Sequence, residues 1–379
     1  MDIFKNKSDK LNTDELARYK RHLTLKEIGE EGQIILKNSS VIFIGAGGIG
    51  SSALIYTAAA GIGTIGIVDN DYVDISNLQR QIIHSTLEIG NKKTDSAKQT
   101  ILKLNPNCKI NTFDERINTK NILKIIADYD IVCDCSDNFG TRYLINDACI
   151  ILNKPYIYGA VQGFEGQISV FNLNNKSPNL RDLLPERPRK DIIPSCEDFG
   201  ILGVNTGLIG ILQANEIIKL LTKQGQILDG KILIFNLLNM SMKKLNLNAN
   251  IKNKSIKDLT SLKDYYETNE CSINQIAIKT ISSSEFQEIY QNKTNNIMIL
   301  DVREKNEFEK FSLTGSTSIP LSLLGDELWL KFIRENGKDK KIFTLCQKGF
   351  RSEKASEILI KHKIQSISIK GGIDKIKLV

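Results

Sequence analysis

A glycine-rich stretch early in the chain has a spacing that suits phosphate binding. Gly45, Gly47 and Gly50, in the stretch VIFIGAGGIG, follow a run of β-forming residues and precede a segment typical of a helix. In such a unit the first glycine permits a tight turn, the second lets the backbone approach a phosphate, and the third allows the helix to pack closely. The motif, in which we include Gly48, predicts a nucleotide site but specifies neither the nucleotide nor the reaction.

An acidic residue, Asp69, follows the next predicted strand, residues 65–68. It lies about twenty residues beyond the last glycine, where a dinucleotide fold places the carboxylate that holds a ribose hydroxyl. A mostly polar and cationic set comes next: Asp71, Ser76, Asn77, Leu78, Gln79, Arg80 and Lys93. Such donors and positive charges suit a triphosphate, whereas a nicotinamide cofactor carries only two bridging phosphates.

Another predicted strand, residues 128–134, leads into Asp137 and Asn138. Ligands of open α/β sheets bind at the carboxyl ends of the strands. Mg²⁺ is commonly held by one or two carboxylates together with substrate phosphates. Asp137 is therefore a candidate Mg²⁺ ligand beside a bound nucleotide.

Two of the seven cysteines stand where a thiol could react. Cys196 follows a polar, proline-bearing loop, residues 172–194, which we expect to be a mobile crossover, and it is either an inert loop thiol or a nucleophile. Cys346 opens CQKGFRS after a predicted strand, where backbone N–H groups and an arginine could stabilise a thiolate. No two cysteines have C-x-x-C spacing, so we expect no disulfide scaffold. Cys133 and Cys135 are expected to be small core residues.

The composition is that of an ordinary globular protein long enough for two domains. The chain has 379 residues, of which 41% are hydrophobic and 25% charged, and a formal net charge of +7. Its lysines are scattered rather than interleaved with aromatic residues, so we expect a solvated surface and no nucleic-acid partner. No run approaches the roughly 18 apolar residues of a membrane span, and the first residues lack a signal-peptide core. We therefore expect a soluble, unsecreted protein.

The order of the predicted elements indicates an α/β fold in two domains. Residues 13–245 alternate strands and helices as a Rossmann-like domain does. Residues 246–279 are polar and are expected to form a linker, and the pattern restarts in a small α/β domain at 280–379. At the start of the first domain we expect one helix over residues 13–29.

Residues 13–245 resemble the ThiF/MoeB family of adenylyltransferases, which are related to the ubiquitin-activating enzymes. Members of this family activate the C-terminal carboxylate of ubiquitin-fold sulfur carriers. The resemblance rests on a spaced series: RYKRH at 18–22, GAGGIG at 45–50, VDND at 68–71, SNLQRQ at 76–81, Lys93, DCSDN at 134–138 and GQ at 166–167. Such a series is far more specific than a glycine loop alone.

The resemblance implies a Rossmann-like adenylation domain with a mixed sheet, and it implies roles for several of these residues. Asp69 would hold the ribose of ATP, and Asp137 would position Mg²⁺ and act in catalysis. The phosphates would be held by Asn77, Arg80 and Lys93. The family match favours Cys196 as a nucleophile. A homodimer is also implied, because the family's arginine that matches Arg21 reaches into the nucleotide site of the neighbouring subunit.

Residues 280–379 resemble a rhodanese domain in LDVRE, GSTSIPL and CQKGFRS. In that family the loop cysteine, here Cys346, carries a persulfide, which a donor such as a cysteine desulfurase would supply. A buried structural cysteine is the alternative reading.

This chain lacks the zinc-binding cysteine pairs that many members of the ThiF/MoeB family carry. Those members carry two C-x-x-C pairs, and the first pair would fall at Asn179 and Asp182 here, while Cys271 is alone in its segment. We predict a zinc-free enzyme, of a branch in which this loop reads PNxRDLxPE.

Together these expectations describe a fusion enzyme. It would use ATP and Mg²⁺ to adenylylate the final glycine of a carrier that ends in Gly-Gly, and Cys346 would deliver sulfur. The small subunit of molybdopterin synthase is the favoured carrier, with thiamine-pathway and tRNA-thiolation carriers as alternatives. A dinucleotide-dependent oxidoreductase would leave Arg80 and Lys93 unexplained, and a non-catalytic scaffold would leave the whole ATP site unexplained. A bacterial cytoplasm or a plastid stroma is the expected location.

Overall fold

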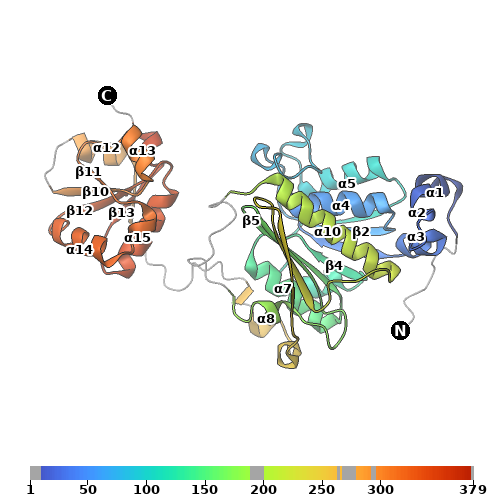
Figure 1. The fold of residues 1–379 in the computed structure, drawn as a ribbon. Coiled ribbons are helices and arrows are strands. Elements are labelled where there is room, and N and C mark those ends of the chain that lie inside the picture. The colour runs from blue at the N-terminus through green and yellow to red at the C-terminus, as the bar shows by residue number, and fades with distance from the viewer. Residues whose placement is uncertain (1–9, 188–199, 263–264, 267–278, 292–295, 377–379) are drawn as a thin grey trace. The chain divides into compact units, whose positions relative to one another are not determined.

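The computed structural model describes residues 10–187, 200–262, 265–266, 279–291 and 296–376. The chain divides into two compact units, Met1–Glu270 and Cys271–Val379, each with a sheet and core of its own (Figure 1). Part of the predicted linker packs in the first unit, since Leu259 and Tyr266 are buried in its core.

The first unit is built on an eight-stranded mixed sheet. Its strands are β1 (Ser40–Ile44), β2 (Thr64–Val68), β3 (Lys109–Phe113), β4 (Ile131–Asp134), β5 (Tyr156–Gln162), β6 (Glu165–Phe171), β7 (Lys231–Asn236) and β8 (Ser241–Asn246). They lie in the order β3-β2-β1-β4-β5-β6-β7-β8, parallel from β3 to β5 and antiparallel beyond. Strands β2 and β3 follow β1 toward one edge of the sheet, whereas β4 and β5 lie on its other side. A crevice therefore opens where β1 and β4 end side by side.

Helices cover both faces of this sheet (Figure 1). They are α1 (Thr13–Arg18), α2 (Lys20–Leu23), α3 (Gly29–Lys37), α4 (Gly48–Ala60), α5 (Lys93–Leu104), α6 (Ile122–Ile126), α7 (Phe139–Leu152), α8 (Leu180–Leu183) and α10 (Gly203–Thr222). Helices α3, α4, α5 and α10 pack on one face, and α6 and α7 on the other. Among the described residues, none of the helices is both long and apolar enough to cross a membrane.

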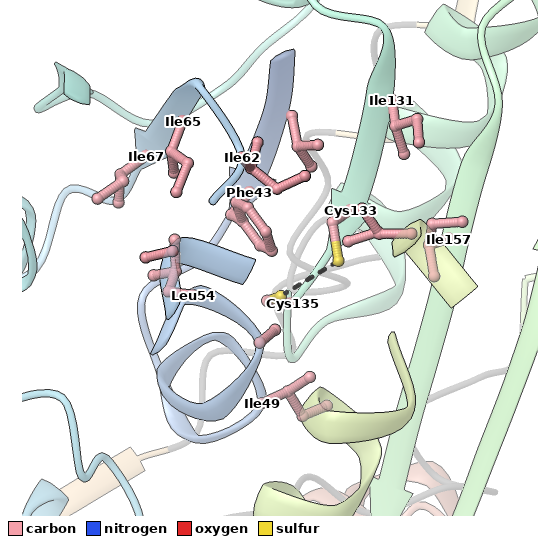
Figure 2. Close-up of a cluster of buried hydrophobic side chains, with 14 of the residues drawn as sticks. Phe43, Ile49, Leu54, Ile62, Ile65, Ile67, Ile131, Cys133, Cys135 and Ile157 are labelled. Carbon is pink, nitrogen blue, oxygen red and sulfur yellow. Dashed lines mark hydrogen bonds between the residues drawn. The ribbon is translucent and has the colours of Figure 1, made fainter. Parts of the chain in front are cut away.

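Strand β1 shows why its sequence suits a central position. Its side chains alternate, so that Val41 and Phe43 enter one core cluster while Ile42 and Ile44 enter the other. In Figure 2, Phe43 lies among apolar side chains of neighbouring elements, close to Cys133 and Cys135. Both cysteines are buried in this cluster, as expected, with their sulfur atoms 3.9 Å apart.

Two local predictions were wrong. The single helix expected over residues 13–29 is divided into α1 and α2, because Tyr19 leaves helical geometry and buries its ring, where its hydroxyl accepts a hydrogen bond from Asn105. The described part of the expected mobile loop, residues 172–187, is packed instead. Its short helix α8 is capped by Asn179 and buries Leu180 fully.

The second unit is a small parallel α/β domain. Its strands β9 (Lys279–Ser282), β10 (Ile297–Asp301), β11 (Ser316–Ser318), β12 (Lys341–Leu345) and β13 (Ile367–Lys370) lie in the order β11-β10-β12-β13-β9. Its helices are α12 (Ser283–Gln291), α13 (Lys305–Lys310), α14 (Glu327–Asn336) and α15 (Phe350–Lys361). Helices α14 and α15 bury apolar side chains on one face of the sheet and α12 on the other.

Candidate active site

The crevice at the ends of β1, β2 and β4 is a cavity of about 760 Å³. Most of the predicted nucleotide-site residues line it: Gly45, Gly47, Gly48, Asp69, Asp71, Ser76, Asn77, Gln79, Arg80, Lys93, Asp137 and Asn138. Segments far apart in the sequence therefore meet at one edge of the sheet, where an open α/β fold binds its ligands.

The remaining predicted residues lie elsewhere. Gly50 is inside α4, where a Cβ atom would come within 2.2 Å of the Gly45 carbonyl oxygen, so its role is packing. Leu78 does not line the cavity, and Arg21 is exposed on α2, away from the cavity of its own chain. Cys196 lies outside the described residues, and Cys346 belongs to the second unit.

The glycine loop is held in shape by its neighbours. Gly45 has φ +108°, and a Cβ atom there would lie 2.7 Å from the carbonyl oxygen of Cys135, so only glycine fits. Asp69 holds Ala46, the residue after Gly45, because its Oδ2 accepts the N–H of Ala46 at 2.8 Å. Its Oδ1 accepts the N–H of Asp71 at 2.9 Å. Helix α4 then starts at Gly48 and directs its N-terminal N–H groups toward this end of the sheet.

Lys93 and Arg80 are two of the cations that line the cavity. Lys93, the first residue of α5, is buried, and its Nζ lies 2.8 Å from Oδ2 of the exposed Asp71. Arg80 donates from Nη1 to the carbonyl oxygen of Ser76 at 3.0 Å. A phosphate chain placed along the glycine loop would thus meet positive charge from two separate segments.

Asp137 and Asp134 share a loop but differ in burial. Asp137 is exposed at the cavity, 3.3 Å from the side-chain amide of Asn138, which caps α7. Asp134 is fully buried, accepts hydrogen bonds from the hydroxyls of Ser136 and Tyr156, and has its pKa raised by burial. Only Asp137 is therefore open to a cation.

Arg142 completes the support of this loop. Its Nη2 donates to the carbonyl oxygen of Ser136 at 2.9 Å, and its guanidinium lies over the ring of Tyr158. Because the loop is held from beneath by Asp134 and Arg142, the position of Asp137 at the cavity is set by buried groups.

The residues that line the cavity suit ATP with Mg²⁺. The glycine loop, the cations Lys93 and Arg80 and the exposed carboxylate of Asp137 match the mode in which Mg²⁺ is shared between a carboxylate and substrate phosphates. Within the described ranges, no three His, Cys, Asp or Glu side chains cluster as metal ligands. Asn179 and Asp182, at the first zinc-ligand position of the family, bond to the backbone in a capping box around α8. Zinc has no thiolate ligands there.

Cys346 lies at the end of β12, before the loop that enters α15. Its buried Sγ accepts the N–H of Gly349 at 3.1 Å, and its thiol lies 3.7 Å from the hydroxyl of Ser352. Gly349 has φ +103°, which lets the loop turn its N–H toward the sulfur. Arg351, whose charge was expected at the thiolate, forms a two-pronged ion pair with Glu307. This pair raises the pKa of Arg351, and a weaker electrostatic interaction with Cys346 acts in the same direction.

Sequence reasoning missed several residues that line or support the cavity: Glu115, Arg116, Ile117, Thr141, Arg142 and His84. Residues 115–117 follow the end of β3, and this position after a strand could have indicated from the sequence that they line the cavity. Arg142 and His84 act through buried contacts, for which the sequence held no signal.

Comparison with known proteins agrees with this geometry. A model of the ThiF family matches residues 19–256. A probable molybdopterin-synthase adenylyltransferase from Pyropia yezoensis is 39% identical over 372 residues, which cover 98% of this chain and 96% of that protein. The chain belongs to the ThiF family. A model of the rhodanese-like domain matches residues 283–378 of this ThiF-family chain.

Two other relatives have names that combine an adenylyltransferase with a sulfurtransferase. The adenylyltransferase and sulfurtransferase MOCS3 of Drosophila virilis is 37% identical over 366 residues, covering 93% of this chain and 80% of that protein. The probable adenylyltransferase/sulfurtransferase MoeZ of Mycobacterium tuberculosis is 36% identical over 371 residues, covering 96% and 93%. Among solved structures, Escherichia coli MccB with ATP has a TM-score of 0.57 at 22% identity, covering 66% of this chain and 76% of that one, which shows a shared fold.

Membership in the ThiF family confirms two predictions. The fold class, a Rossmann-like adenylation domain with a mixed sheet plus a small rhodanese-like domain, is confirmed, and so is the enzyme class, an adenylyltransferase that also carries a sulfurtransferase domain. The alternative of a dinucleotide-dependent oxidoreductase does not agree with this membership. The roles of individual residues stay predictions.

Proposed function

We propose that the chain adenylylates the C-terminal glycine carboxylate of a ubiquitin-fold sulfur carrier at the expense of ATP. One observation carries this proposal: a single cavity joins a glycine loop at a helix N-terminus, the cations Lys93 and Arg80, and the open carboxylate of Asp137. The relative from Pyropia yezoensis is named for molybdopterin synthase, so the small subunit of that enzyme is the carrier we propose.

The chemistry follows from the charges in the cavity. The carrier carboxylate would attack the α-phosphate of ATP, forming an acyl-adenylate and releasing pyrophosphate. Lys93 and Arg80 would stabilise the negative charge that develops on the phosphate oxygens. Asp137 would hold Mg²⁺, which neutralises phosphate charge when bound. Asp69 would hold the ribose while its backbone contacts keep the glycine loop in place.

Sulfur transfer would use the two predicted cysteines. The terminal sulfur of a persulfide on Cys346, supplied by a donor such as a cysteine desulfurase, would attack the acyl-adenylate, giving an acyl disulfide and AMP. The thiolate of Cys196 would then attack Sγ of Cys346. This releases the carrier thiocarboxylate and leaves a disulfide between Cys196 and Cys346, which a thiol reductant must open.

Two further parts of the proposal concern the setting of the enzyme. We propose a homodimer in which Arg21 enters the partner's cavity, since Arg21 is exposed and outside its own. We also propose a bacterial cytoplasm or a plastid stroma as its location.

Labelling of purified carriers tests the choice of substrate. The enzyme is incubated with ATP labelled at the α-phosphate and, separately, with each of three carriers: the molybdopterin synthase small subunit, a thiamine-pathway carrier and a tRNA-thiolation carrier. Labelled AMP should appear on the first carrier and be lost when its terminal Gly-Gly is removed. Labelling of another carrier alone would overturn the choice, and labelling of none would overturn the proposed activity.

A further inference from the structure

His84 is buried beside the glycine loop and has no part in the chemistry above. It lies between η1 (Ile75–Asn77) and α5, and only 6% of its surface is exposed. Both ring nitrogens have partners. Nε2 is 3.0 Å from the carbonyl oxygen of Ala46, and Nδ1 is 2.8 Å from Oγ of Ser96. Because both ring nitrogens are hydrogen-bonded, His84 connects Ala46 to Ser96.

The partners fix which nitrogen carries the proton. A carbonyl oxygen can only accept, so Nε2 bears the hydrogen and donates it to Ala46, while Nδ1 accepts from the Ser96 hydroxyl. Burial lowers the pKa of His84, and the positive charge of Lys93 acts in the same direction, against the carbonyl of Ala46 and the negative charges of Asp69 and Glu88. The neutral ring is therefore the form that holds the loop.

The bond to Ala46 sets the direction of a second group. The peptide between Ala46 and Gly47 is planar and trans, so the carbonyl of Ala46 and the N–H of Gly47 point in opposite directions. Because His84 draws the carbonyl toward itself, the N–H of Gly47 must point away from His84. Gly47 lines the cavity and caps α4, so this peptide is one that a phosphate would meet.

The bond to Ser96 connects a second phosphate-binding element. Ser96 is fully buried in α5, within a turn of Lys93, whose side chain lines the cavity. Ala46 is at the same time held from its other side by Asp69. His84 thus joins the glycine loop to the helix that carries the cation.

We propose that His84 is a positioning residue for the triphosphate of ATP, acting mainly through the Ala46–Gly47 peptide, with a smaller contribution through α5, and without touching the nucleotide. This inference rests on the proposed function, since it assumes that ATP occupies the cavity. It assigns the ATP affinity of this enzyme partly to a side chain outside the cavity.

A pair of amide variants separates the two hydrogen bonds of His84. In His84→Gln the amide nitrogen falls near the place of Nε2 and can still donate to Ala46, whereas in His84→Asn it falls near Nδ1 and cannot. We expect the Asn variant to bind a non-hydrolysable ATP analogue about tenfold more weakly than wild type or worse, because a buried carbonyl is left unpaired. The Gln variant and Ser96→Ala should stay within about threefold of wild type. The exposed His362 in the second unit gives a control, His362→Asn.

Calorimetric titration with the analogue, without carrier, measures these affinities, and steady-state exchange kinetics give KM for ATP and for the carrier separately. The Asn variant should raise KM for ATP and leave KM for the carrier unchanged, a split that general loss of structure would not produce. Wild-type affinity in a folded Asn variant, or equal losses in the Asn and Gln variants, would overturn the proposal. If the Asn variant does not fold, His84→Leu takes its place with the same expectation. Failure of the wild type to bind the analogue would instead refute the proposed function.

Discussion

At the scale of single residues, burial decides what each acidic side chain does. Asp134 and Asp137 stand in one loop, yet Asp134 accepts hydrogen bonds inside the core and Asp137 is open to the cavity. The sequence placed both at a strand end and could predict a carboxylate at the ligand edge. It could not assign the two roles, because they depend on Tyr156 and Arg142, which come from other elements.

Glu307 in the rhodanese-like domain gives a pH-dependent prediction. Both of its oxygens lie 2.7 Å from guanidinium nitrogens of Arg351, which lowers its pKa from 4.5 to about 2. Since the folded pKa is depressed, the pair contributes its full stability above about pH 4.5 and loses it as the pH falls toward 2. Both side chains are about one third exposed, so we expect a contribution below about 1 kcal/mol.

Glu307→Gln should therefore lower the melting temperature of this domain by about 2–4 °C at pH 7 and by less at pH 3. Trp329, the single tryptophan of the chain, packs in the same domain and reports its unfolding by fluorescence. Glu327→Gln, at an exposed ion pair with Arg334, is the matched control. A difference as large at pH 3 as at pH 7 would contradict the assignment.

At the scale of elements, polar contacts hold α8 in place at the position where the family resemblance would put the first pair of zinc ligands. Asp182 bonds to the N–H of Asn179 and also accepts hydrogen bonds from the backbone of Asn250 and the side chain of Asn253. Nearby, Arg181 donates to both oxygens of the fully buried Asp147. These contacts join residues 179–182 to α7 and to residues 250–253.

Breaking this ion pair should destabilise the first unit strongly. Arg181→Met leaves the carboxylate of Asp147 buried with the hydroxyl of Tyr266 but without its cation, which costs about 3–5 kcal/mol in comparable cases. The double variant Arg181→Met with Asp147→Leu should lose less, because no unpaired buried charge remains. Scanning calorimetry measures the stability of the single and the double variant. Since we predict a zinc-free enzyme, a chelator should leave the wild-type transition unchanged. A single variant within about 1 kcal/mol of wild type would contradict this role.

The regular elements were largely predictable, and the irregular ones were not. The predicted strands at residues 65–68 and 128–134 correspond to β2 and β4, and both strands end where they were predicted to end, because their apolar pattern agrees with their position in the fold. The break at Tyr19 was not predictable, since it depends on Asn105, a residue far along the chain. The packing of α8 likewise depends on Asn250, Asn253, Tyr265 and Tyr266, which lie in the predicted linker.

At the scale of the whole molecule, strand order explains why the candidate site could be predicted at all. The glycine loop, Asp69 and Asp137 follow β1, β2 and β4, which are neighbours in the sheet. Strand-end positions are readable in a sequence, so these residues were found. His84 and Arg142 support the same edge from the interior, and their contacts exist only after the chain has folded.

The proposed role of Arg21 in the partner's cavity can be tested with mixed dimers. If Arg21 acts in the partner's cavity, an Arg21→Ala chain and an Asp137→Ala chain should each form an inactive homodimer. A mixed dimer would hold one intact site, and random mixing makes half of the dimers mixed, so about one quarter of wild-type activity should return. Co-expression with two different affinity tags isolates the mixed dimer. No recovery in that dimer would contradict the partner role.

Carrier-dependent exchange of labelled pyrophosphate into ATP tests the central claim most directly. The wild-type enzyme should exchange label only when a carrier with its terminal glycine is present. Asp137→Ala should reduce the exchange by about 100-fold or more, because phosphate charge is no longer neutralised at the cavity. Cys346→Ala should exchange normally, since adenylylation precedes sulfur transfer. Normal exchange in the Asp137→Ala enzyme, or exchange that needs no carrier, would contradict the proposed adenylylation.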